Sequence, residues 1–130
     1  MALARNSDLF AAGVDISGVH DWTSRSRSPI GERNRYEQTR DAEAALRLAW
    51  ESSPVSAVAG WKSPGLIIHA DDDRNVDYNQ STDLVQRLIK LNAPFETLTI
   101  VDDTHHFMLF SNQLKVNEAT AEFLKRMLMK

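Results

Sequence analysis

Cysteine is absent from this sequence of 130 residues. A chain without cysteine forms no disulfide framework and no thiolate nucleophile, and it holds no cysteine-based zinc or iron–sulfur site. Long apolar runs are missing as well, and the longest fall well short of the roughly 20 residues that a membrane span needs. The sequence therefore predicts neither a disulfide-dependent fold nor a membrane-spanning helix.

An excess of basic residues is also missing. The chain has 15 Lys and Arg residues against 18 Asp and Glu residues, and its formal net charge is −3 at pH 7. Because binding to phosphate backbones depends on clustered Lys and Arg that outnumber acids, we expect no nucleic acid partner. The remaining composition, with 42% hydrophobic and 25% charged residues, is typical of one globular domain over residues 1–130.

Helix-like and strand-like segments alternate along the chain. Apolar runs rich in β-branched residues predict three strands, and apolar residues at helical spacing predict four helices. The expected strands are 9–14 with Ile16, 65–69 and 95–101, and the expected helices are 1–5, 41–51, 79–91 and 116–129, the third capped by Asn79. Residues 23–36, rich in Ser, Arg, Gly and Pro, predict an irregular loop. This order is typical of an α/β fold with a small parallel sheet of about three strands flanked by helices.

Polar loops follow all three expected strands, at Ser17–Trp22, Asp71–Val76 and Asp102–Phe107. Ligand binding and catalysis in parallel sheets gather at the carboxyl ends of strands, because the loops there open onto one edge. A carboxylate on one loop can then orient an imidazole on the next, whose other ring nitrogen acts as a base. The loops therefore predict two members of a catalytic triad.

Four sequence blocks carry a resemblance to a known family. They read SSPV at 52–55, PGLIIH at 64–69, DDRNV at 72–76 and QS at 80–81. In this order they resemble the C-terminal third of catalytic domains of the prolyl oligopeptidase family, which includes acylaminoacyl and dipeptidyl peptidases. The resemblance implies part of an α/β-hydrolase fold and the hydrolysis of peptide or acyl-peptide bonds by a serine peptidase.

The resemblance also implies roles for single residues. It makes Asp73, three residues before Val76, the catalytic acid, and it makes His105, after the next strand, the catalytic base. His106 stands where the family often has glycine, so an exchange of roles between the two histidines stays open.

A substrate pocket is implied in the same way. Its residues are Val19, Trp22 and Val76, with Asn75 near the backbone of a peptide substrate. The resemblance implies no metal and no organic cofactor.

The nucleophile of the triad is missing from the sequence. No Gly-x-Ser-x-Gly motif occurs, and Ser17 has Asp15 two residues before it and Val19 two residues after it. Since the serine precedes the acid and the base in α/β-hydrolases, the resemblance implies a serine upstream of Met1 and an isolated chain that is inactive. A sheet cut in this way would expose its first strand as an edge, which predicts a homo-oligomer or strand exchange between copies.

Two other classes of function fit parts of the sequence. A metal-dependent hydrolase or a receiver-like acidic pocket would use the hard ligands of the strand ends, which are His69, Asp71, Asp72, Asp73, Asp102, Asp103, His105 and His106. The other hypothesis is a non-enzymatic α/β binding or assembly module, which would need no nucleophile.

Overall fold

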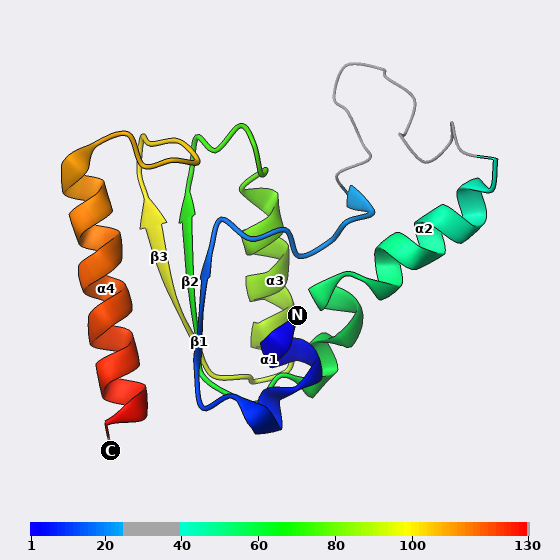
Figure 1. Cartoon of the computed structure of the whole chain (residues 1–130), viewed down its shortest axis with the longest axis horizontal. Coiled ribbons are helices and arrows are strands. Elements are labelled where there is room, and N and C mark those ends of the chain that lie inside the picture. Colours follow the sequence, from blue (N-terminus) through cyan, green and yellow to red (C-terminus); the bar gives the residue numbers. More distant parts are fainter. Residues whose placement is uncertain (25–39, 130) are drawn as a thin grey trace.

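The computed structural model describes residues 1–24 and 40–129, and a sheet of three parallel strands lies at its centre (Figure 1). The strands are β1 (Gly13–Ile16), β2 (Gly65–Ala70) and β3 (Phe95–Ile100), side by side in that order. Gly65 of β2 stands opposite Gly13 on one side and Phe95 on the other. All three carboxyl ends therefore reach the same edge of the sheet, as the expected α/β architecture requires.

Helices cover both faces of this sheet (Figure 1). One face is covered by α4 (Phe110–Leu128), and the other by α3 (Asn79–Lys90), the short α1 (Ala2–Arg5) and the 3-10 segment η4 (Pro54–Gly60). The helix α2 (Ala42–Glu51), which lies between β1 and η4 along the chain, extends away from the sheet. The four expected helices are all present.

Side chains of β2 divide between two apolar cores because successive residues of a strand point to opposite faces. Leu66, Ile68 and Ala70 pack toward α4, together with Phe123. Ile67 packs on the other face against α1, η4 and α3. Every residue of β2 is buried, so β2 is the central strand of the sheet, as its uninterrupted apolar run predicts.

The first strand is shorter than predicted. A 3-10 turn, η1 (Ser7–Leu9), occupies its expected beginning, and Leu9 is 79% exposed. The buried hydroxyl oxygen of Ser7 accepts hydrogen bonds from the amides of Lys62 and Ser63, at 2.9 and 3.0 Å. These contacts hold the chain in a turn before it enters the sheet, which a local apolar pattern does not reveal.

Two helix starts also differ from the prediction. Asn79 is the first residue of α3 rather than its cap, and the side chain of Asp77 accepts from its amide at 2.9 Å. The last helix begins at Phe110 rather than at Val116. Residues 25–36 of the predicted arginine-rich loop lie outside the described residues. Within residues 1–24 and 40–129, no helix is both long and apolar enough to cross a membrane.

The buried carboxylate of Asp103 organises the segment that leads into α4. It accepts hydrogen bonds from the amides of Thr104 at 2.7 Å and Met108 at 2.8 Å, and from the side-chain amide of Asn112 at 2.7 Å. These donors, with Asn112 first, outweigh the opposing effect of burial and hold the pKa of Asp103 below its ordinary value of 3.8. The carboxylate thus closes the loop between β3 and α4 into a compact turn.

We expect Asp103→Asn to lower the free energy of unfolding at neutral pH, because an amide oxygen accepts fewer of these hydrogen bonds. The stabilisation by a carboxylate with a lowered pKa is complete above the ordinary value and is lost as the pH falls through the folded value. The difference between wild type and variant should therefore shrink below about pH 4. Urea unfolding of both proteins, at neutral pH and at a series of acidic pH values, measures this difference in the free energy of unfolding. Asp102→Asn is the matched control, since Asp102 is exposed and has a positive φ that asparagine also adopts.

Candidate active site

The loop that follows β2 folds around the side chain of Asp73, whose carboxylate is fully buried. One carboxylate oxygen, Oδ1, accepts hydrogen bonds from the amides of Asn75 and Val76, each at 2.9 Å. An aspartate that accepts from amides two and three residues ahead of it closes a tight turn within its own loop. The hydrogen bonds within residues 73–76 therefore fix both the turn and the orientation of the Asp73 carboxylate.

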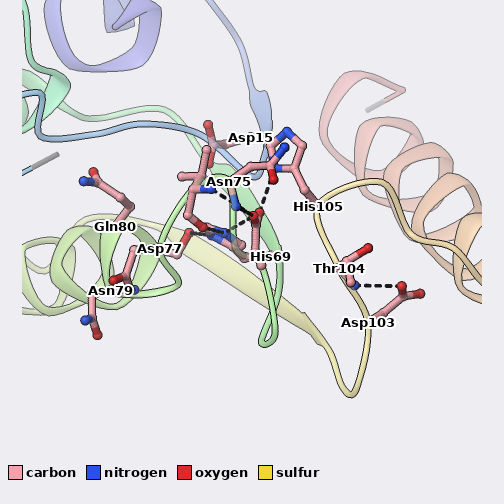
Figure 2. A network of polar contacts seen from close by, with 12 residues as sticks. Asp15, His69, Asn75, Asp77, Asn79, Gln80, Asp103, Thr104 and His105 are labelled. Carbon is pink, nitrogen blue, oxygen red and sulfur yellow. Dashed lines mark hydrogen bonds and ion pairs between the residues drawn. The ribbon is translucent and has the colours of Figure 1, made fainter. Parts of the chain in front are cut away.

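His105 reaches the other oxygen of this carboxylate from the loop after β3. Its Nδ1 lies 2.7 Å from Oδ2 of Asp73, and its side chain is 28% exposed (Figure 2). The neighbouring His106 is exposed and packs its ring edge-on against the His105 ring, with 5.1 Å between the ring centroids. Of the two histidines that the sequence left open, the structure brings His105 to Asp73.

Asp73 is held in its ionised form. Burial would by itself raise the pKa of this carboxyl group, but the Val76 amide, the His105 ring and the Asn75 amide together lower it below its ordinary value of 3.8. An ionised acid in this position accepts the Nδ1 hydrogen of His105. That hydrogen bond leaves Nε2 of His105 as the ring nitrogen able to take a proton, on a side chain that solvent still reaches.

The loop after β1 is fastened to the start of α3 by Gln80. The side-chain oxygen of Gln80 accepts from the amides of His20 and Asp21, both at 2.8 Å, and its amide nitrogen donates to the Asp21 carbonyl at 3.0 Å. The buried ring of His20 lies 2.9 Å from Asp15 and 3.0 Å from the Gln80 carbonyl. This loop is therefore held to α3 by several polar contacts, two of which are buried.

The residues predicted for the substrate pocket fall into two groups. Asn75 and Val76 lie in the Asp73 loop, where Asn75 is exposed and Val76 is buried. Val19 instead lines a cavity of about 220 Å³ beside β1, together with His20, and neither Asp73 nor His105 is among the described residues that line it. Trp22 is 41% exposed, and its amide donates to the Ser53 hydroxyl at 2.9 Å.

Sequence reasoning missed a second histidine at the acid. His69, in β2, places Nε2 3.1 Å from Oδ2 of Asp73, and its Nδ1 lies 2.7 Å from the hydroxyl of Ser81. The available signal was a polar residue inside a continuous apolar strand, because buried polar groups need partners. Among the site roles predicted from the sequence, His69 had only that of a metal ligand.

The acidic strand ends do not gather as a ligand cluster. In the part of the chain that the structure describes, no group of three or more His, Cys, Asp or Glu side chains is arranged to hold a metal ion. His69 and His105 direct ring nitrogens to Asp73, while Asp71 accepts from the backbone amide of Asp102 at 2.8 Å. The arrangement is that of an acid with its histidines.

Comparisons with solved structures match this fold to peptidases. An acylaminoacyl peptidase from Pyrococcus horikoshii superposes with a TM-score of 0.80 at 26% identity, over 99% of this chain and 22% of that one. Dipeptidyl peptidase 4 from Porphyromonas gingivalis gives a TM-score of 0.80 at 23% identity, over 98% of this chain and 17% of that one. This chain therefore spans about a fifth of the length of these two proteins.

A third solved structure and the family model match as well. Est1E from Butyrivibrio proteoclasticus, a structure with ferulic acid bound, superposes with a TM-score of 0.74 at 23% identity, over 99% of this chain and 54% of that one. The model of the prolyl oligopeptidase family matches residues 1–130. The three parallel strands are thus part of an α/β-hydrolase fold, and the chain belongs to the prolyl oligopeptidase family of serine peptidases.

Proposed function

We propose that this chain provides the acid and the base of a Ser-Asp-His triad that hydrolyses peptide or acyl-peptide bonds. The observation that carries the proposal is the 2.7 Å contact between Nδ1 of His105 and the buried carboxylate of Asp73, at the carboxyl ends of parallel strands. Membership of a serine peptidase family supports it. An acyl-peptide or dipeptidyl substrate is in keeping with the named activities of the similar structures.

In the proposed mechanism, Nε2 of His105 takes the proton from a serine hydroxyl as the serine attacks the scissile carbonyl. The same nitrogen then gives that proton to the leaving amine, and the steps repeat with water to release the acyl group. Asp73 keeps Nδ1 of His105 protonated and stabilises the imidazolium that forms. Asn75 would contact the substrate backbone, while Val19, Trp22 and Val76 would contribute to the pocket before the scissile bond.

The serine of this mechanism is proposed to lie outside these 130 residues, because the sequence contains no Gly-x-Ser-x-Gly elbow. Most of the oxyanion hole, which stabilises the tetrahedral intermediate, would lie with it. The chain would thus contribute two of the three triad residues to a longer catalytic domain.

The isolated chain should form no covalent adduct with a fluorophosphonate reagent and should not hydrolyse a chromogenic aminoacyl substrate. The physical reason is that an acid and a base alone provide no nucleophile for acyl transfer. Intact-mass spectrometry measures the adduct. A stoichiometric adduct on any serine of the chain would place the nucleophile within these residues and contradict the proposal.

A chimera should show the roles of the two residues directly. We expect the Pyrococcus horikoshii acylaminoacyl peptidase, with its matching segment replaced by this chain, to hydrolyse its peptide substrates. Asp73→Asn and His105→Gln should each lower kcat by about 10⁴-fold, the loss seen when the acid of such a triad is replaced. Steady-state kinetics measure this loss.

His106→Gln is the matched control in the chimera, because this neighbouring ring does not contact Asp73 and its loss should leave kcat nearly unchanged. Full activity of the Asp73 or His105 variants, or a loss confined to the His106 variant, would refute the assignment. A folded chimera that is inactive with the wild-type segment would count against the proposal as well.

We also propose that copies of the isolated chain associate through β1. Among the described residues no strand pairs with its outer edge, and Ile16 is 45% exposed there. The amides of Gly13 and Ser17 bond to the β2 side, so the intervening amides of Val14 and Ile16 point to the open edge. Such an edge accepts another strand.

Ile16→Lys should weaken this self-association, because a charged side chain at an open edge opposes strand pairing. Sedimentation velocity over a range of protein concentrations measures the association. Ile89→Lys, on the exposed side of α3, is the matched control and should behave as wild type. A wild-type chain that stays monomeric at all concentrations would refute the proposed association.

A further inference from the structure

The structure contains a second histidine that the triad does not use. His69 is 2% exposed and lies on the face of β2 that packs against α3. Its Nε2 lies 3.1 Å from Oδ2 of Asp73 and 3.0 Å from the carbonyl oxygen of Val76. Its Nδ1 lies 2.7 Å from the hydroxyl of Ser81, in the first turn of α3.

These contacts select one protonation state of the ring. Both partners of Nε2, a carboxylate and a carbonyl, are acceptors, so Nε2 must carry a hydrogen. The Ser81 hydroxyl can donate to Nδ1, which then needs no hydrogen of its own. His69 is therefore satisfied as the neutral ring protonated at Nε2, with the Ser81 hydroxyl donating to Nδ1.

We propose that His69 is a positioning residue for the catalytic acid, and that it limits how strongly Asp73 holds His105. The inference rests on the proposed function. Oδ1 of Asp73 has two backbone donors, and Oδ2 has the two histidine rings, at 2.7 Å for His105 and 3.1 Å for His69. Because one oxygen divides its charge between two donors, removing one of them strengthens the bond to the other.

Other groups around the two rings complete the site. The Tyr78 ring packs edge-on against the His69 ring, with 5.5 Å between the centroids. The Tyr78 hydroxyl forms a hydrogen bond of 2.7 Å with the hydroxyl of Thr99. His106 packs against His105. None of the described ion pairs brings a Lys or Arg side chain to Asp73, so its charge is balanced by neutral donors and by the His105 ring.

A residue that only filled space would act differently from a donor. Loss of packing would loosen the loop and weaken the contact between His105 and Asp73. Loss of the His69 donor alone would shorten that contact. The two cases therefore differ in the sign of the effect on His105, and this sign can be measured without any enzymatic activity.

The test is nuclear magnetic resonance of the whole chain with ¹⁵N-labelled histidine, which is tractable because the sequence has four histidines. In the wild type, the ¹⁵N shifts of His69 should report a neutral ring protonated at Nε2, and His105 should show a hydrogen-bonded proton on Nδ1. In His69→Leu this proton should move downfield. His69→Gln, which keeps an N–H donor at the end of the side chain, should bring it back toward its wild-type position.

Three results would overturn the inference. They are a His69 ring protonated at Nδ1, an unmoved His105 proton in a folded His69→Leu chain, and an upfield movement shared by the Leu and Gln variants. If His69→Leu does not fold, Ser81→Ala decides. Without the Ser81 hydroxyl at Nδ1, the Nε2–H of His69 becomes a weaker donor to Asp73. The His105 proton should then move downfield, and an unchanged spectrum would refute the inference.

Asp73→Asn separates this inference from the proposed function. If the His105 proton signal does not depend on Asp73, the acid and base pair itself fails, whatever His69 does. If it depends on Asp73 but not on His69, the proposed function stands and only the role of His69 is refuted.

Discussion

A carboxylate shielded from water needs hydrogen-bond donors for both of its oxygens, and Asp73 obtains them from three parts of the chain. Its own loop gives the amides of Asn75 and Val76, β2 gives His69, and the loop after β3 gives His105. An unpaired buried charge would be costly, so these segments have to be assembled together. The geometry of the site is therefore tied to the pairing of β2 with β3.

The contacts around Asp73 require one register of β2 in the sheet. Successive side chains of β2 alternate between the two faces of the sheet, so a slip of one residue would turn His69 toward α4 and bring Ile68 to the acid. The same slip would move an apolar side chain out of a core in which Ile68 is completely buried. Hydrophobic packing and the hydrogen bonds of the acid thus select the same register.

Local signals in the sequence were sufficient for the general plan. The apolar run of β2 and the acids that follow it predicted a central strand with a catalytic-type loop. The family resemblance selected Asp73 and His105, and the structure places them in contact. What the sequence could not provide was the pairing of polar groups that are distant along the chain. Gln80 reaches back to a loop some 59 residues earlier, and no local pattern encodes such a contact.

Errors at the ends of elements have the same origin. Ser7 turns the chain before β1 through amides that follow η4, and Asp103 builds the turn that precedes α4. In both cases one buried oxygen accepts hydrogen bonds from two backbone amides, and the element boundary follows from that oxygen rather than from propensity. His69 differs, since a histidine within a buried apolar strand could have been recognised as a group in need of a partner.

The first turn of α3 has a mechanical consequence. Two adjacent residues there contact different loops, because Gln80 binds the loop after β1 and Ser81 binds the His69 ring behind the acid. A small rotation or shift of this turn would move both contacts at once. A displacement of this end of α3 would therefore reach the loop after β1 and the His69 ring together, so these two parts of the site are not mechanically independent.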